Sequence, residues 1–145
     1  MAHDTLAMPS EVVDLYSFPL PGIEEARYIL RELDWGEHFI GIEMNPAAGN
    51  RDIYIYSLKE AAQFLRYGTA GMGLSTGGKG AISWFDMDKL VAWVRNDLRD
   101  PVLADAIAHD TSLEEAYYGK VQKLGRLIDM RYAQLTDLVA SADKQ

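Results

Sequence analysis

The residues best suited to chemistry lie in the glycine-rich segment 68–80, GTAGMGLSTGGKG, which holds six of the twelve glycines in the chain. Glycine is favoured where the backbone needs positive φ angles or must approach a ligand closely. Gly73, Gly78 and Lys79 match the G-x-x-x-x-G-K motif, in which backbone N–H groups and a lysine bind phosphates. The context differs, because Gly80 replaces the Mg²⁺-binding Ser or Thr and the expected strand and helix are exchanged. The motif therefore gives little support to a nucleotide site.

The same segment matches the G-x-S-x-G motif of serine hydrolases through Gly73, Ser75 and Gly77. In that motif a strained strand-to-helix turn exposes a nucleophilic serine. Either Asp86 or Asp105, and then His109, follow in the chain order that such hydrolases use. Chain order does not establish hydrogen-bond geometry, and the flanking elements are again exchanged. We therefore assign no catalytic residue, and the sequence leaves open whether the protein is an enzyme.

Two tyrosines add a second feature that a ligand could use. Tyr54 and Tyr56 alternate along a strand-like run, so they would project from one sheet face and could stack on a ligand. An aromatic pair packed under a helix is the commoner arrangement, and we expect it here. With Ser75, Gly78 and Lys79 they define a candidate site for an anionic small molecule beneath the glycine-rich segment. The alternative interpretation of that segment is a connector without a binding role, and we favour it.

The remaining polar groups favour local structural roles. Asp86 and Asp88 could present two carboxylates to Mg²⁺, but the same spacing is typical of a helix N-cap followed by a first-turn acid. His109 lies one turn after Asp105, as expected for a local pair near a helix C-terminus. His38 shares a strand face with apolar residues, as a partly buried histidine does. We assign no metal or cofactor.

Charge and composition narrow the class of partner. With 22 acidic and 14 basic residues the 145-residue chain has a formal net charge of −8, which repels nucleic acids and anionic membranes. The absence of cysteine excludes disulfides and thiolate metal sites and favours a cytoplasmic location. We see neither a signal sequence nor an apolar run of membrane-spanning length. We expect one globular domain over 1–145, with a frayed N-terminus at 1–10.

The N-terminal half is predicted to contain two helices that flank a hairpin. A helix is expected over 23–33, and the runs 38–44 and 52–56 predict two paired strands. Ser57 and Glu60 form a capping-box pattern, which begins a second helix. The buried face of that helix is expected to carry Leu58, Ala61, Ala62 and Leu65.

The C-terminal half is predicted to be mainly helical. A third strand is expected over 81–85, after which Asp86 caps a helix. Pro101 suits the first position of a short helix over 101–107. The apolar face of the first of these helices is expected to carry Met87, Leu90, Val91, Val94 and Leu98.

A second capping box at 112–115 is predicted to begin the longest helix, which continues to about residue 139. This order of elements predicts an α+β fold, in which a small sheet of about three strands is covered by helices and the C-terminal half ends in a long amphipathic helix. An all-α domain with short extended pieces is the alternative.

That long helix carries an apolar stripe at coiled-coil spacing, here called the C-terminal stripe, which comprises Tyr117, Val121, Leu124, Ile128, Arg131, Leu135 and Leu138. Either the stripe packs within its own domain, which we favour, or it forms an interface in a homodimer or with another protein. In both cases Arg131 requires a carboxylate or solvent, because a desolvated guanidinium without a partner costs several kcal/mol. For the homodimer we expect tight packing around Leu124 and Ile128.

Two functions remain open at this stage. The first is a non-enzymatic, acidic, cytoplasmic interaction or regulatory module that binds another protein, for which the negative charge favours a basic partner. The second is a small-molecule binding protein or enzyme with its site under the glycine-rich segment. Negative charge, the C-terminal stripe and the lack of a convincing catalytic set favour the first.

Overall fold

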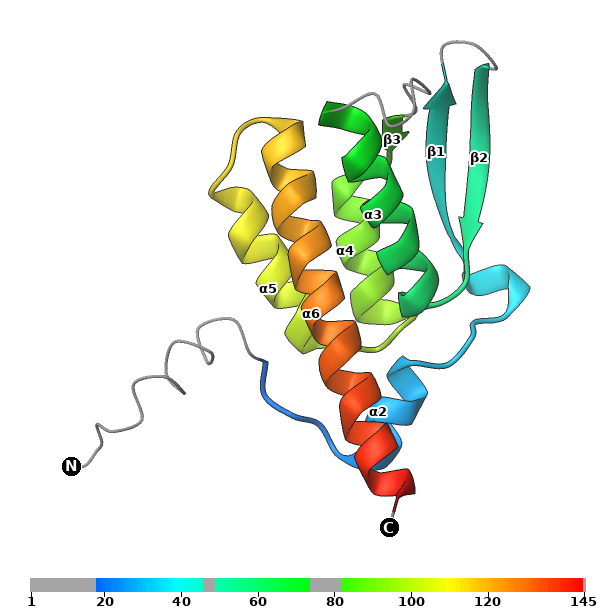
Figure 1. The fold of residues 1–145 in the computed structure, drawn as a ribbon, viewed down its shortest axis with the longest axis vertical. Helices are drawn as coiled ribbons and strands as arrows, with labels where there is room; N and C mark the ends of the chain where they lie inside the picture. Colours follow the sequence, from blue (N-terminus) through cyan, green and yellow to red (C-terminus); the bar gives the residue numbers. More distant parts are fainter. Residues whose placement is uncertain (1–17, 46–48, 74–81, 145) are drawn as a thin grey trace, which may run out of the picture.

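The elements of the protein form an α+β fold, seen in a computed structural model that describes residues 18–45, 49–73 and 82–144 (Figure 1). A small sheet lies on one side of a group of helices, and the C-terminal half is helical, as predicted. In chain order the elements are α2 (Ile23–Ile29), the 3-10 helix η2 (Trp35–Glu37), β1 (Phe39–Asn45), β2 (Gly49–Ile55), α3 (Leu58–Gly73), β3 (Ile82–Trp84), α4 (Met87–Asn96), α5 (Pro101–Ser112) and α6 (Tyr117–Asp143).

The sheet is antiparallel, with the strand order β2-β1-β3. The predicted hairpin is confirmed, with Phe39 opposite Ile55 and Ile40 opposite Tyr54. Because successive side chains of a strand point to opposite faces, this register separates the two pairs. Phe39 and Ile55 are buried, whereas Ile40 and Tyr54 are exposed, so the helices cover only the first face.

The predicted starts of α3 and α4 are confirmed. The Ser57 hydroxyl accepts a hydrogen bond from the backbone N–H of Glu60 at 3.1 Å. The Glu60 carboxylate accepts in turn from the N–H of Tyr56 at 2.7 Å, one residue before the position that a capping box uses. The Asp86 carboxylate accepts from the N–H of Lys89 and caps α4. These bonds satisfy backbone donors that a helix start leaves without partners.

The predicted capping box at 112–115 is wrong. Ser112 is the last residue of α5, and its hydroxyl donates to the backbone carbonyl of His109 at 2.6 Å. Helix α5 passes its predicted end because Thr111 is buried and donates its hydroxyl to the carbonyl of Ile107. Helix α6 therefore begins after this turn, and it also ends later than predicted.

Two further helix ends differ from the prediction. Helix α2 stops at Ile29, and the N–H of Leu33 donates instead to the carbonyl of Tyr56 at 2.7 Å, which ties the chain to the end of β2. Helix α3 continues through residues 68–73, where a loop was expected. Helix α3 as a whole packs against α6 and β3. Tertiary packing of this kind can override the low helix propensity of glycine, about 1 kcal/mol per residue. Residues 74–81 lie outside the described part of the chain.

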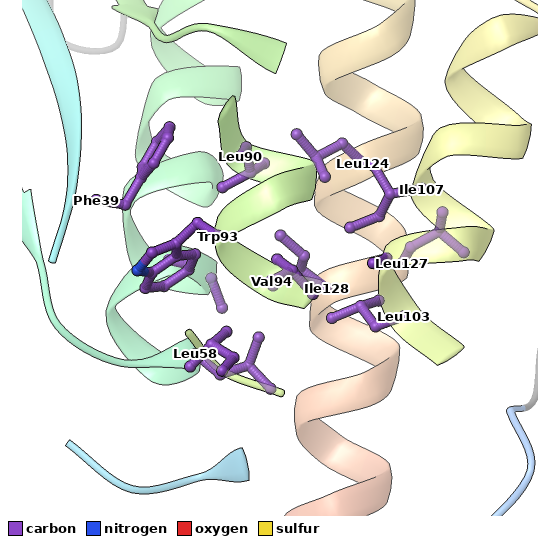
Figure 2. Packing of buried hydrophobic residues seen from close by; sticks show 14 of the residues in the cluster. Phe39, Leu58, Leu90, Trp93, Val94, Leu103, Ile107, Leu124, Leu127 and Ile128 are labelled. Atoms are coloured by element: carbon purple, nitrogen blue, oxygen red, sulfur yellow. The ribbon is translucent and has the colours of Figure 1, made fainter. Parts of the chain in front are cut away.

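The core joins the helices to the buried face of the sheet. Figure 2 shows side chains of α4, α5 and α6 meeting in one cluster, with Phe39 of β1 and Trp93 of α4 on the sheet side. The centroids of these two rings lie 5.6 Å apart. Gly41 admits the Phe64 ring onto β1, since a Cβ at Gly41 would lie 2.5 Å from that ring. The sheet is thus fixed rigidly to α3 and α4 through aromatic packing.

The C-terminal stripe packs within its own chain, which favours the intramolecular alternative. Val121, Leu124, Ile128 and Leu135 are each at most 1% exposed. Helix α6 packs on α2, α3 and α5, so a partner that docked on this stripe would first have to displace them. Tyr117 and Leu138, at the two ends of the stripe, are partly buried.

The carboxylate that Arg131 requires is supplied by Asp100 of the same chain. The Arg131 Nε and Nη2 atoms donate to the two Asp100 oxygens at 2.8 and 2.9 Å, and both side chains are 1% exposed. Asp100 also accepts from the N–H of Leu103 and caps α5, as predicted for this helix start. The remaining Arg131 donor reaches the carbonyl of Pro19 and the side chain of Gln134. This network fastens α6 to α5 and to the N-terminal segment.

Candidate functional site

The uncovered face of the sheet carries the largest group of exposed aromatic side chains among the described residues. Trp35 is 67% exposed, and Ile40, Tyr54 and Trp84 are each 44% exposed. Large apolar side chains that gather on one surface commonly mark a binding site. We call this surface the aromatic face and define it by Trp35, His38, Ile40, Tyr54, Tyr56 and Trp84.

Backbone geometry brings four of these rings together. Tyr54 and Tyr56 alternate along β2 and its end, and His38 enters β1 beside them. The His38 ring centroid lies 4.9 Å from that of Tyr54 and 5.5 Å from that of Tyr56. Trp35 lies 4.9 Å from His38 and packs edge-on against Tyr54 at 5.6 Å. Such offset and edge contacts are favourable arrangements of aromatic rings.

Short-range hydrogen bonds position Trp35 and His38. Helix η2 begins with a capping box, in which the Asp34 side chain and the Glu37 side chain each accept from the other residue's backbone N–H. The His38 Nδ1–H donates to the backbone carbonyl of Trp35, and this bond fixes the imidazole ring against the indole ring. The Trp93 indole N–H donates to the carbonyl of Glu37 at 2.7 Å and ties η2 to α4. The rings are therefore held in place before any ligand arrives.

The tyrosines lie on one sheet face as predicted, but the expectation that a helix covers them is wrong. Tyr54 is exposed, and the side chain that packs on both tyrosines is Trp35 of η2. Partial burial raises the pKa of the Tyr56 phenol, and the neighbouring Tyr54 and Glu60 raise it further. Tyr56 therefore stays a neutral hydrogen-bond donor at physiological pH.

A pocket of about 570 Å³ adjoins the aromatic face where the sheet meets α4. Its sheet wall is formed by His38, Ile40, Ile42 and Trp84, and its other wall by α4, including Trp93. The charged groups at its margin are Asp86, Lys89 and Asp97. The pocket thus combines apolar and aromatic walls with a rim in which carboxylates outnumber ammonium groups.

Asp97 is an electrostatically unfavourable carboxylate. Burial raises the pKa of its carboxyl group, and the negative charge of Glu37 raises it further, whereas Arg31 and Arg99 lower it. Arg31 donates to the backbone carbonyl of Asp97 at 2.9 Å and not to its carboxylate. The carboxylates of Asp97 and Asp86 form no salt bridge with the cations of the described residues. The Asp86 carboxylate already accepts from the N–H of Lys89 at the start of α4, so a cation from outside would meet Asp86 beside that bond and Asp97 at the opposite end of the helix.

A second pocket, of about 580 Å³, lies between the start of α4, the end of α5 and the start of α6. Asp86, Asp88, Glu115 and Lys120 line it together with Tyr117, whose hydroxyl accepts from the N–H of Phe85 at 3.1 Å. Burial raises the pKa of Tyr117, and this backbone bond lowers it. In the described ranges, no three acidic or histidine side chains come together as a metal-binding group.

The other predicted groups are separated or lie beyond the described ranges. Asp105 pairs with Arg95 at 2.8 Å, and His109 pairs with Asp110 at 3.0 Å, so the predicted Asp105–His109 pair is wrong. Asp105 pairs instead with a residue of the adjacent helix α4, and His109 pairs with the next residue in the chain. Of the candidate ligand site, Ser75, Gly78 and Lys79 are outside the described residues. Tyr54 and Tyr56 belong to the aromatic face.

Sequence reasoning missed most of the aromatic face. Trp35, Ile40 and Trp84 were assigned no role, although Ile40 and Tyr54 are opposite each other in the hairpin. The alternation of the two strands contained part of the signal, because it places His38, Ile40, Tyr54 and Tyr56 on one face once the register is known. Trp35 could not be found in this way, since η2 is not part of the strand pattern.

Comparison with protein-family models, curated proteins and solved structures finds no match to this chain. Among the helices of the described residues, none combines the length and the apolar character that crossing a membrane requires.

Proposed function

We propose that this protein is a non-enzymatic interaction module that binds another protein through the aromatic face, in the cytoplasm. The observation that carries the proposal is the exposed ring cluster of Trp35, His38, Tyr54 and Tyr56, with Ile40 and Trp84 beside it. Tryptophan and tyrosine dominate the binding energy of protein interfaces, because they bury much apolar area at little cost in conformational entropy.

The edge strand β2 supports the same function. It lies at the border of the sheet and pairs only with β1, so its outer backbone groups have no strand partner among the described elements (Figure 1). An exposed sheet edge can accept an extended segment of a partner, whose main chain then supplies the hydrogen bonds. The aromatic face adjoins this edge through Tyr54, so one segment can use both.

The test compares the intact protein with two surface variants as bait in an extract of the source organism. Trp35→Ser combined with Tyr54→Ser removes the centre of the aromatic face. Leu113→Ser is the matched control, because Leu113 is 62% exposed and lies at the end of α5. A protein captured by wild type and control should then be purified and its affinity measured by calorimetry.

We expect the double variant to bind that purified protein at least about tenfold more weakly, since a central aromatic contributes about 2 kcal/mol or more. The control should bind like wild type. Equal affinity of all three baits, or recovery of the same proteins by all three, would refute the aromatic face as the binding surface. Circular dichroism confirms that each variant is folded.

A further inference from the structure

We infer that the partner presents a basic segment and that one of its lysine or arginine side chains enters the pocket between the sheet and α4. This inference rests on the proposed function, because the pocket adjoins the aromatic face. Three features of the pocket indicate which side chain fits it. They are its apolar walls, the charged groups that line it and the position of Lys89.

The walls of the pocket suit a long aliphatic stem. Ile40, Ile42 and Trp84 offer an apolar surface on one side, and Trp93 lies on the other. Lysine and arginine side chains bury such stems along apolar surface and keep their charged ends near polar groups. Trp84, which is 44% exposed, is the tryptophan of this wall that a guest can reach, and a cation near the face of a tryptophan is stabilised by the ring.

The rim of the pocket suits a positive end group. Asp86 and Asp97 line it at opposite ends of α4, so one guest cation meets only one of them, and neither carboxylate has a salt bridge to a described cation. Glu37 is close enough to Asp97 to disfavour its ionised form, as does burial. An incoming ammonium or guanidinium would relieve this repulsion. The net charge of −8 on the chain attracts the same partner over longer distances.

Lys89 is the opposing cation of the rim. It lies in the first turns of α4 and lines the pocket, and its ammonium forms no ion pair with the described carboxylates. A cationic guest must therefore bind against the charge of Lys89. The inference consequently makes two predictions of opposite sign, which ordinary loss of stability would not produce.

The probe is a random ten-residue peptide library displayed on phage and selected on the wild-type protein. We expect the selected sequences to be enriched in lysine or arginine. One such peptide, labelled with a fluorophore, is then titrated with each variant, and anisotropy gives the dissociation constant. Asp97→Asn should weaken binding about threefold, and Lys89→Gln should strengthen it about threefold, as expected for partly exposed charge pairs.

Controls separate this inference from the proposed function. Asp137→Asn removes an exposed carboxylate from α6 and should leave the affinity unchanged. If peptides lose affinity with Trp35→Ser and Tyr54→Ser but respond to neither Asp97→Asn nor Lys89→Gln, the aromatic face stands and the basic partner is refuted. If the aromatic variants bind normally, the proposed function falls. Selection of no peptide, or of acidic peptides, also overturns the inference.

Discussion

The carboxylate of Asp97 should destabilise the folded protein at neutral pH. Its pKa is raised from the ordinary 3.8, chiefly by burial and then by Glu37, so the folded chain binds this proton more tightly than the unfolded chain does. The free energy of unfolding therefore falls as the pH rises from 3.8 through the pKa of Asp97 in the folded chain. Above that pKa, the destabilisation caused by Asp97 stays constant. Asp97 also lies at the C-terminus of α4, where the helix dipole disfavours negative charge. This position therefore lowers the stability of the folded protein at neutral pH as well.

We predict that Asp97→Asn raises the midpoint of thermal unfolding at pH 7 and that the gain disappears below pH 3.8. The substitution keeps the backbone carbonyl to which Arg31 donates. Differential scanning calorimetry of both proteins across this pH range measures the difference. A lower midpoint at pH 7, or a gain that persists unchanged in acid, would show that the charge of Asp97 is not the cause.

For Arg131, the sequence predicted the kind of partner but not which residue provides it. Its place in an apolar stripe required a carboxylate, and the structure provides one. The identity of that carboxylate was not predictable, because Asp100 is 31 positions away from Arg131. Its place before Pro101 was also fully accounted for by the start of a helix. Asp100 performs both roles, since its two oxygens together accept from Arg131 and from the N–H of Leu103.

At the scale of elements, α6 contains a glycine that its packing does not require. A Cβ at Gly125 would lie 3.9 Å from the Cβ of Leu65 on α3, which is an ordinary van der Waals contact. Glycine in a helix interior costs about 0.5–1 kcal/mol relative to alanine. We predict that Gly125→Ala stabilises the protein by about that amount, measured as the free energy of unfolding in urea.

Gly41 provides the matched comparison. A Cβ there would meet the Phe64 ring at 2.5 Å, so Gly41→Ala forces that ring or the strand to shift and should destabilise the protein by about 1–3 kcal/mol. The two Gly→Ala changes differ in the space around the added methyl group and in the element that carries it, a helix for Gly125 and a strand for Gly41. If both changes had the same sign, local crowding would not be what decides the cost.

The starts of α3, α4 and α5 were predictable, whereas the start of α6 and the ends of α2, α3 and α5 were not. Ser57, Asp86 and Asp100 each accept a bond from a nearby backbone N–H, so the signal lies within a few residues. The ends depended on distant partners. Helix α2 stops where Leu33 bonds to Tyr56, and α3, which packs on α6 and β3, continues past Gly68. Such contacts do not appear in local patterns.

At the scale of the whole molecule, the class of fold followed from the periodicity of each segment, whereas the candidate site depended on how the segments assemble. The pattern of β1 and β2 specified two faces but not which one the helices cover. Phe39 and Ile55 decided that, because they pack against Phe85, Trp93 and Ala61 in the core. The opposite face was thereby left to Trp35, Tyr54 and Trp84.

The C-terminal stripe gives the last prediction, which concerns assembly. Leu124 is 0% exposed between α6 and its neighbours, so a carboxylate at this position would be buried without a partner. That penalty is several kcal/mol, comparable with the 5–15 kcal/mol that stabilises an ordinary domain. We therefore predict that Leu124→Asp abolishes cooperative unfolding, observed by circular dichroism during heating. Leu113→Asp, at an exposed position on the same half of the chain, should retain it.

Sedimentation equilibrium at micromolar concentration completes this test. If the stripe is core, any self-association of the wild-type protein must use another surface, and Leu113→Asp should sediment like wild type. A dimeric wild type together with a folded, monomeric Leu124→Asp would instead identify the stripe as a dimer interface. That result would require α6 to separate from α3 and α5, which its buried bond between Arg131 and Asp100 opposes.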